Sequence, residues 1–171
     1  MATSAPSPVP TLPEGPSLQE RFAPHNACFG CGPANAKGLR IRSFENPGAP
    51  GEYVAIFTPQ EHHQAFPGVV NGGICGALLD CHSNWTACAT MMKATGAESP
   101  PCTVTADFAV TLRRPTPMDA EIVVRAKVIE LSEDKKRALV EAKLESKGKV
   151  TATCKGTFVA VEEGHPAYHR W

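Results

Sequence analysis

The sequence predicts an α+β fold in which one long helix packs against a curved antiparallel sheet of five to six strands. A single long stretch, residues 72 to 95, repeats its apolar residues at helical spacing. After it come segments in which apolar and polar residues alternate, joined by short turn-rich connections. At 171 residues the chain is long enough for one ordinary domain. These observations predict one domain with a helix on one face of a sheet.

The first half of the chain contains a predicted hairpin and the helix. Strands are expected at residues 38–44 and 52–59, because both alternate and the turn-rich "ENPGAPG" separates them. Residues 60–70 contain a Pro-Gly turn and are predicted to be irregular. The helix over 72–95 should end near Gly96, which precedes the breaker "SPP".

The second half is predicted to be almost wholly strand. The connections "PTPMD", "SEDKK" and "KG" are short and rich in turn residues. Three long strands joined in this way should form an antiparallel meander. The four predicted strands span residues 102–114, 120–131, 137–146 and 149–161.

Composition and the two ends of the chain narrow the class of protein. Seventeen basic and 17 acidic residues give a formal net charge of zero, which gives no reason to expect nucleic acid or an anionic membrane as a partner. Residues 1–24 are rich in Ser and Pro and are predicted to be a disordered tail rather than a targeting segment. Residues 25–161 form the predicted domain. Residues 162–171 form an extension that either packs on the surface or on a partner subunit, or is disordered.

Seven cysteines and the absence of a long apolar run indicate the cellular compartment to expect. No segment approaches the roughly 18 apolar residues of a membrane span. An odd number of scattered cysteines fits a reducing, cytoplasmic compartment. Cys28 and Cys31 have the spacing of half a zinc site or of a redox pair, but no matching pair follows and His25 leaves the set one ligand short. We therefore expect a tight glycine-rich turn and no metal.

The predicted helix has two unlike faces, found by advancing about 100° per residue. One face is apolar and should pack against the sheet. The opposite face is small, with one carboxylate in its midst, whereas a solvent-facing side normally carries long charged residues. This small face predicts contact with a second subunit, a narrow ligand or both; tight packing within the monomer is the alternative. The apolar face comprises Ile74, Ala77, Leu78, Cys81, Trp85, Cys88, Ala89 and Met92, and the small face comprises Gly72, Gly73, Gly76, Asp80, Ser83, Ala87 and Thr90.

The start of this helix has the parts that acyl transfer requires. Asn71 is a good N-cap residue, and the amides of the following glycines lie at the positive end of the helix dipole. An amide with no side chain in front of it suits a carbonyl oxygen that becomes an oxyanion. Asp80, about two turns further along, could activate water or attack directly.

The order of these segments resembles the hotdog-fold acyl-CoA thioesterases of the phenylacetate-pathway (PaaI-like) type. The resemblance lies in "CFGCGPANAKGLRI", "HHQAFPGVVNGGICGALLD" and "TVTADFAVTLRRPTP", and it covers residues 28 to 161. It implies a single hotdog domain that hydrolyses an acyl-CoA or acyl-carrier-protein thioester. It also implies a homodimer or a dimer of dimers, with sheets joined edge to edge and active sites between subunits. No cofactor is implied beyond coenzyme A as part of the substrate and product.

The resemblance also implies roles for individual residues. The Gly72 amide would polarise the thioester carbonyl, and Asp80 from the partner subunit's helix would act as general base or nucleophile. Gln64 would hold water or substrate, and Thr105 would orient water near the acid. Asn71 stands where the family usually has histidine; it can cap the helix but cannot shuttle protons near neutral pH.

Further residues are expected to contact the substrate. Coenzyme A carries nucleotide phosphates, and the adjacent Arg113 and Arg114 are candidate cations for them. Only one of the two should face a given phosphate, because neighbouring strand residues point to opposite faces. Three histidines, His62, His63 and His82, are available to compensate for Asn71. The expected contacts are Gly73, His63, Leu79, Asn84, Arg113 and Arg114, with Met91 as a further tunnel wall.

Two other functions remain open at this stage. A non-catalytic acyl or CoA binder would explain the asparagine at position 71, although an unused carboxylate in an apolar channel is costly. A hotdog hydratase or dehydratase is the other; such enzymes usually pair an essential histidine with an acid or amide, which Asn71 and Asp80 do not reproduce.

Overall fold

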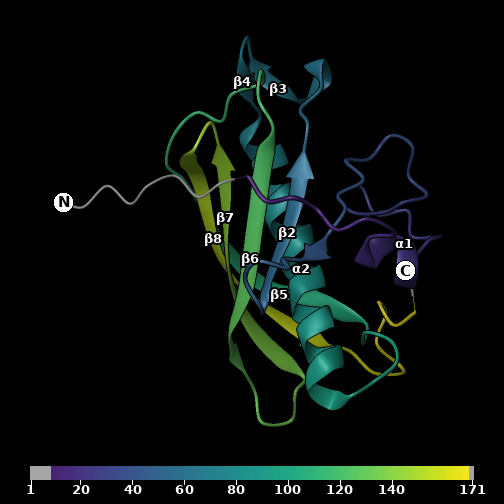
Figure 1. Ribbon diagram of the computed structural model, residues 1–171. Coiled ribbons are helices and arrows are strands. Elements are labelled where there is room, and N and C mark those ends of the chain that lie inside the picture. Colours follow the sequence, from purple (N-terminus) through teal and green to yellow (C-terminus); the bar gives the residue numbers. More distant parts are fainter. Residues whose placement is uncertain (1–8, 170–171) are drawn as a thin grey trace.

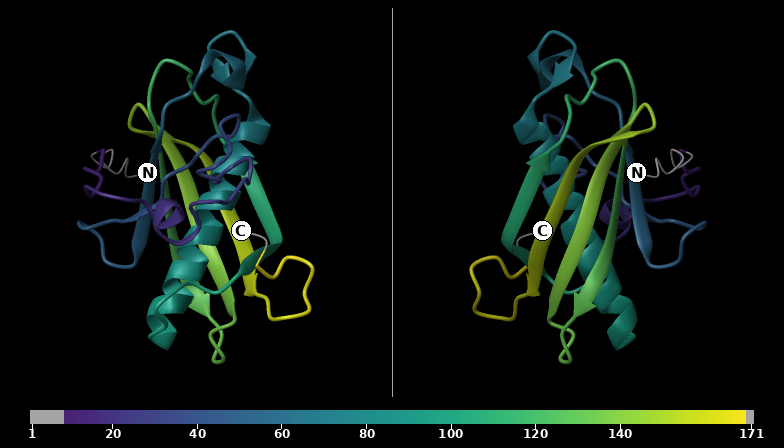
Figure 2. Two further views of the ribbon diagram at one scale, coloured as in Figure 1. Left: turned by 90° about the vertical axis from the view of Figure 1, so that its right-hand side faces the viewer. Right: turned by 90° about the vertical axis from the view of Figure 1, so that its left-hand side faces the viewer.

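The computed structural model describes residues 9–169 and has the α+β architecture expected from the sequence. Helix α2, Gly72–Thr95, lies between a six-stranded sheet on one side and the N-terminal segment on the other (Figure 1). The sheet curves around this helix (Figure 2). The prediction of one long central helix and five to six antiparallel strands is confirmed.

The strands pair antiparallel in the order β1-β2-β6-β7-β8-β5. Strands β6, β7 and β8 form the expected meander, and β2 extends it. Strand β5 pairs with β8 and not with its successor β6, so the connection that follows β5 crosses to the other side of the meander. The strands are β1 Phe44–Glu45, β2 Glu52–Phe57, β5 Thr103–Leu112, β6 Ile122–Leu131, β7 Arg137–Ser146 and β8 Lys149–Ala160.

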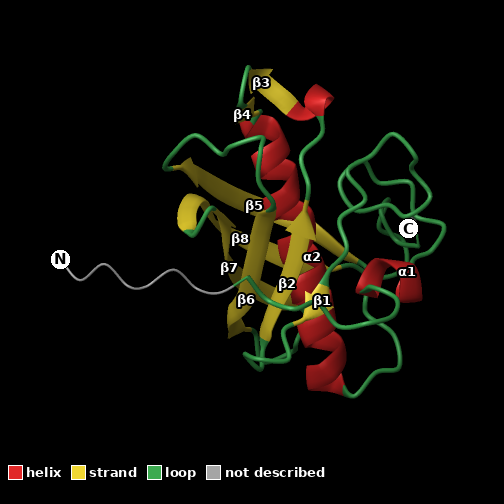
Figure 3. Cartoon of the chain, turned by 45° about the horizontal axis from the view of Figure 1, so that its top comes forward, coloured by secondary structure: helices red, strands yellow, loops and turns green. Residues whose placement is uncertain are grey.

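Local signals fix both ends of α2. The Asn71 side chain accepts a hydrogen bond from the Gly73 amide at 2.8 Å, as an N-cap does. Gly96 ends the helix in the left-handed conformation with φ of 69°, where the lack of a β-carbon removes the strain. Above the helix start, a short 3-10 helix (Glu61–His63) leads into a small hairpin of β3, Gln64–Phe66, and β4, Val69–Val70 (Figure 3).

The predicted strand at residues 38–44 is wrong for most of its length. Only Phe44 and Glu45 pair with β2. The amides of Leu39 and Ile41 instead donate to the carbonyls of Phe29 and Gly30 at 2.7 and 3.0 Å. Alternation in this segment reflects burial of Leu39 and Ile41 beneath the "CFGCG" turn, a partner that the local pattern does not reveal.

The predicted disordered tail, residues 1–24, is wrong around helix α1, Leu18–Phe22. Ser17 and Glu20 form a capping box at its start. Gln19 is 1% exposed, and its amide donates to Ser43 Oγ at 2.8 Å while its carbonyl oxygen accepts the Ser43 amide. This helix is held by tertiary contacts rather than by its own length. Residues 1–8 lie outside the described residues.

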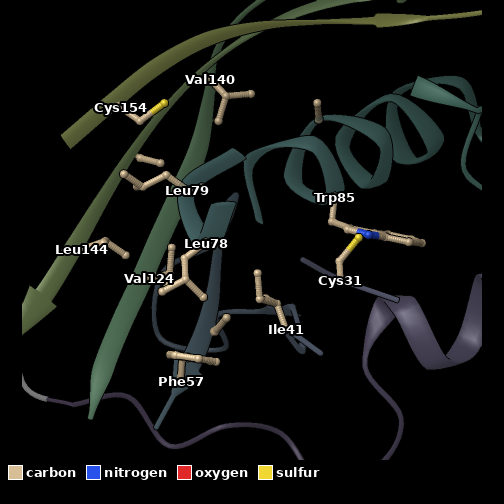
Figure 4. Close-up of a cluster of buried hydrophobic side chains, with 14 of the residues drawn as sticks. Cys31, Ile41, Phe57, Leu78, Leu79, Trp85, Val124, Val140, Leu144 and Cys154 are labelled. Atoms are coloured by element: carbon tan, nitrogen blue, oxygen red, sulfur yellow. The ribbon is translucent and has the colours of Figure 1, made fainter. Parts of the chain in front are cut away.

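The faces of α2 are only partly as predicted. Leu78 points toward Val124 and Phe57 of the sheet, as expected, and Leu79 lies near Val140 (Figure 4). The prediction that Cys81 and Trp85 face the sheet is wrong, because both side chains contact the N-terminal turn. Trp85 lies beside Cys31 in Figure 4, and a β-carbon at Gly30 would lie 2.3 Å from Cys81 Sγ.

The small face of α2 is not bare along its whole length. Ser83 and Ala87 are fully buried within the single chain, so the alternative of tight packing inside the monomer holds for the middle of the helix. Gly73 is exposed, and Gly72 and Gly76 are half-buried, so the first two turns remain accessible. Within residues 9–169, no helix combines the length and the hydropathy that crossing a bilayer requires.

Candidate active site

Two carbonyl groups hold the start of α2 in place. The Asn71 amide donates to the His63 carbonyl at 2.8 Å, and the Val70 amide donates to the Thr116 carbonyl at 2.9 Å. Cys75 Sγ also lies 3.6 Å from Thr116 Oγ1, as its hydrogen-bond donor. The segment around the small hairpin and the "RPTP" corner (residues 114–117) therefore hold the helix start by hydrogen bonds. Thr116 was not singled out in the sequence; its place between two prolines was the available signal.

The Gly72 amide is left free for a ligand. Asn71 Oδ1 takes the Gly73 N–H, and the first helical bond runs from Cys75 N to Asn71 O at 3.1 Å. Among residues 9–169, no group accepts a hydrogen bond from Gly72 N. A β-carbon at Gly72 would lie 2.9 Å from Leu112 Cδ1 of β5, so glycine keeps this approach open. The arrangement leaves the Gly72 amide without an acceptor in the described residues, at the positive end of the helix.

Asp80 is half-buried, and β5 holds its carboxylate. Thr105 Oγ1 donates to Asp80 Oδ1 at 2.7 Å. Burial raises the pKa of the Asp80 carboxyl above its ordinary value, and the hydrogen bond from Thr105 opposes that rise. The structure thus brings together the two residues to which the family resemblance gave the acid and its partner.

A cavity of about 360 Å³ surrounds this carboxylate. Asn84 lines it and accepts a hydrogen bond from Thr103 Oγ1 at 2.6 Å, which fixes its amide against the start of β5. Ala167 also lines it, so the C-terminal extension folds back over the cavity in the described residues. The "CFGCG" turn forms the remaining wall, with Cys28 and Cys31.

The two halves of the site lie too far apart in one chain to act on the same carbonyl. Gly72 and Asp80 are eight residues apart on one helix, and a rise of about 1.5 Å per residue separates them by roughly 12 Å along its axis. A thioester carbonyl spans about 1.2 Å. A single protomer therefore supplies either the amide or the acid to a given carbonyl group.

Residues predicted to line the acyl tunnel have other surroundings. Leu79 and Met91 are 0% and 1% exposed, so both side chains are buried in the core of the single chain, and their place in an acyl tunnel stays a prediction. The reason is that α2 is covered on two sides and not one. His63 is 6% exposed, packs against Phe57 and accepts the Gln60 amide at Nδ1, which leaves it holding the loop. Gln64 is exposed on β3.

His82 is not available to replace the missing histidine. Its side chain is fully buried, and Nδ1 lies 2.8 Å from Ser43 Oγ. Burial lowers the pKa of His82 to about 4, so the ring stays neutral at neutral pH. Ser43 joins His82 to Gln19, and this buried polar network links α2 to α1. His62 is exposed beside the small hairpin.

The paired arginines after β5 point to different partners. Arg113 Nε donates to Thr153 Oγ1 at 3.2 Å, and Arg114 Nη1 donates to the Val150 carbonyl at 3.5 Å. Arg113 also lines a cavity of about 580 Å³ with Arg125 and other cationic side chains of β6, β7 and β8. The Asp80 cavity includes neither arginine among its lining residues.

Comparisons with solved structures identify the fold. A thioesterase superfamily protein from Shewanella loihica is 25% identical, with a TM-score of 0.59 over 76% of this chain and 98% of that one. The PaaI protein of the E. coli phenylacetic acid degradation operon is 15% identical, with a TM-score of 0.61 over 75% of this chain and 85% of that one. Zebrafish thioesterase superfamily member 2 is 21% identical, with a TM-score of 0.58 over 75% and 90%.

Comparison of sequences finds no significant match to this chain, whereas comparison of structures does. No protein-family model matches the chain, and no curated protein matches it significantly. The structural likeness extends over nearly the full length of the three proteins named above. The chain therefore has the hotdog fold of the PaaI-like thioesterases.

Proposed function

We propose that the protein hydrolyses an acyl thioester, carried by coenzyme A or an acyl-carrier protein, to a carboxylic acid and a thiol. The observation that carries this proposal is the half-buried Asp80 carboxylate, held by Thr105 in a cavity, on the same helix as the available Gly72 amide. Hydrolysis needs a base and an oxyanion donor, and these two groups supply them.

The reaction uses Asp80 on the carbonyl carbon and Gly72 on the carbonyl oxygen. Asp80 takes a proton from a water as the water oxygen bonds to the carbonyl carbon. The negative charge that develops on the carbonyl oxygen is stabilised by the Gly72 N–H and the helix dipole. The carbon–sulfur bond then breaks, and the thiol leaves with the proton. If Asp80 instead attacks the carbonyl carbon directly, the thiolate leaves first, and water then hydrolyses the mixed anhydride and supplies the proton for the thiol. Asn71 contributes by binding the Gly73 amide with its side chain, which caps the helix and leaves the Gly72 amide available as a donor.

Both groups reach one carbonyl only if two protomers share the site. We infer a homodimer in which Gly72 of one protomer and Asp80 of its partner face the same substrate. Strand β5 supports this arrangement, since it is an edge of the sheet with Phe108 43% and Leu112 57% exposed. An unprotected apolar edge strand is suited to pairing with a second copy. Leu112 also lies next to Gly72, so the edge and the helix start adjoin.

The proposal is tested by assaying short, long and aromatic acyl-CoAs with wild type and Asp80→Asn. Loss of thioester absorbance is the better readout, because a thiol reagent would also react with the exposed Cys28. Replacing the base should lower kcat about 10²- to 10⁴-fold, since that is the usual contribution of a general base. Asp134→Asn, in the turn between β6 and β7, makes the same chemical change away from the cavity and should keep full activity. Tight acyl-CoA binding without turnover by wild type would contradict the proposal and indicate a binding protein.

A further inference from the structure

Three cysteine sulfurs converge beside the candidate active site. Cys28, Cys31 and Cys81 are free thiols whose Sγ atoms all lie within 4.8 Å of one another, and Cys28 and Cys81 are 3.8 Å apart. The first two come from the "CFGCG" turn, and the third comes from α2, 50 residues later in the chain. Cys81 was expected to face the sheet, so sequence reasoning did not connect it with the turn.

This spacing fits a metal ion bound by thiolates. Tetrahedral Zn²⁺ with Zn–S bonds of about 2.3 Å holds its sulfurs roughly 3.8 Å apart. The 3.8 Å between Cys28 and Cys81 already matches, and the other sulfur–sulfur distances, at most 4.8 Å, need to shorten by no more than about 1 Å. Cys28 and Cys31 are separated by two residues, which is also the ligand spacing of structural zinc sites.

The turn is shaped to place its sulfurs over α2. At Gly30, a β-carbon would lie 2.3 Å from Cys81 Sγ, so any other residue would displace that thiol. At Gly32, a β-carbon would lie 2.4 Å from the Asn26 carbonyl oxygen. Asn26 Oδ1 accepts the Cys28 amide at 2.7 Å and thereby fixes the first ligand's backbone. The glycines and Asn26 therefore bring the turn close to the helix.

Hydrogen bonds link the three sulfurs and favour the thiolate at Cys28 only, because the hydrogen bonds of Cys31 and Cys81 to Cys28 raise the pKa of both of those thiols. Hydrogen bonds from the Cys31 and Cys81 thiols, and from the backbone amides of Gly30 and Cys31, lower the pKa of Cys28. The hydrogen bond to Cys28 raises the pKa of Cys31 to about 12, and a hydrogen bond from the Trp85 side chain opposes that rise. Figure 4 shows the Cys31 sulfur against the indole nitrogen of Trp85. Donors to the ligand atoms are a regular feature of metal–thiolate sites.

We propose that Cys28, Cys31 and Cys81 bind a thiophilic divalent cation of the Zn²⁺ class through three thiolates. Binding displaces the thiol protons and fastens the N-terminal turn to α2. All three cysteines line the cavity that also contains Asp80, so the fourth position of the ion faces that cavity. The metal site adjoins the proposed hydrolytic site, but neither Gly72 nor Asp80 is among its ligands.

The test measures metal on the full-length protein, purified with reductant and without chelator. The wild type should contain one Zn²⁺ per chain by inductively coupled plasma mass spectrometry. After exchange with Co²⁺, it should show the near-ultraviolet charge-transfer band of cobalt–thiolate bonds. Cys28→Ser and Cys81→Ser should lose both signals. Cys102→Ser removes a thiol outside the cluster and should keep them.

Several outcomes would overturn the proposal. Reduced, folded wild type that binds neither Zn²⁺ nor Co²⁺ would do so, and so would unchanged binding by Cys28→Ser, whose exposed side chain makes misfolding the smaller concern. A Cys28–Cys81 disulfide found by non-reducing peptide mapping of the same preparation would show a redox pair in place of a metal site. Trp85→Phe keeps an aromatic side chain but removes the N–H donor to Cys31, and should weaken Co²⁺ binding about 10- to 100-fold. Thioester hydrolysis measured on the same samples reports separately on Asp80 and Gly72.

Discussion

At the scale of single residues, Asn71 and Gly72 have different roles at the start of α2: Asn71 caps the helix, and Gly72 offers its amide as a donor. The asparagine side chain satisfies the Gly73 amide, and its own amide is held by the His63 carbonyl. The Gly72 amide then has no acceptor within the described residues. Asparagine performs this capping without a titrating group, so the oxyanion donor does not depend on a histidine at position 71.

Gly72→Pro tests the amide directly. Proline is well tolerated at the first helical position, and Asn71 already has the extended conformation, with φ −60° and ψ 134°, that precedes proline. The substitution therefore removes the N–H with little change of backbone. We expect kcat to fall about 10²- to 10³-fold, as for other oxyanion donors. Gly72→Ala adds a similar β-carbon near Leu112 but keeps the amide, and an equal loss in that variant would assign the effect to steric contact.

Thr105 is predicted to position the Asp80 carboxylate through its hydroxyl. Thr105→Val has nearly the same shape but cannot donate, and a hydrogen bond to a charged group contributes about 1.5–3 kcal/mol. We expect kcat to fall about 10- to 100-fold with KM little changed. Thr105→Ser restores the hydroxyl and should recover most of the activity. Identical kinetics for the valine and serine variants would show that the hydrogen bond has no catalytic role.

At the scale of elements, the sequence predicted what local chemistry decides. Helix 72–95 was placed correctly, because Asn71 caps one end and Gly96 adopts the left-handed conformation at the other. The four later strands were also found, to within two residues, since their alternation and turns are local. Helix α1 and the environment of Cys81 were missed because each depends on contacts between distant segments, through Ser43 and the "CFGCG" turn.

Arg125 on β6 joins three strands through two ion pairs, and its side chain is 8% exposed. Its Nη1 lies 2.9 Å from Glu52 of β2, and its Nε lies 2.9 Å from Glu145 of β7. Arg125→Met would leave Glu52 without its ion-pair partner and Glu145 with Lys143 alone, at 2.7 Å, so we expect a loss of about 3 kcal/mol in the free energy of unfolding. Urea denaturation measures this. Lys136→Met breaks the exposed pair with Glu162 and should change stability little; equal effects in the two variants would contradict the account.

At the scale of the whole molecule, the candidate site is two half-sites. The sequence predicted each half, because a capped glycine amide and an acid on one helix follow from their spacing. It did not show that Leu79 and Met91 are buried, since burial on both sides of α2 follows from the complete fold. The convergence of the halves requires a second copy, for which the apolar edge strand β5 provides the pairing surface.

Mixing two inactive variants is the most direct measurement of this shared site. Asp80→Asn and Gly72→Pro are each expected to be nearly inactive, and subunit exchange between them yields a mixed dimer in which one site has both an intact Asp80 and an intact Gly72. With random exchange, half of the dimers are mixed and one of their two sites works, so activity should recover to roughly a quarter of the wild-type value. If the mixture stays as inactive as its parents after exchange is shown by mass spectrometry, the two residues do not meet across protomers, and the proposed site is wrong.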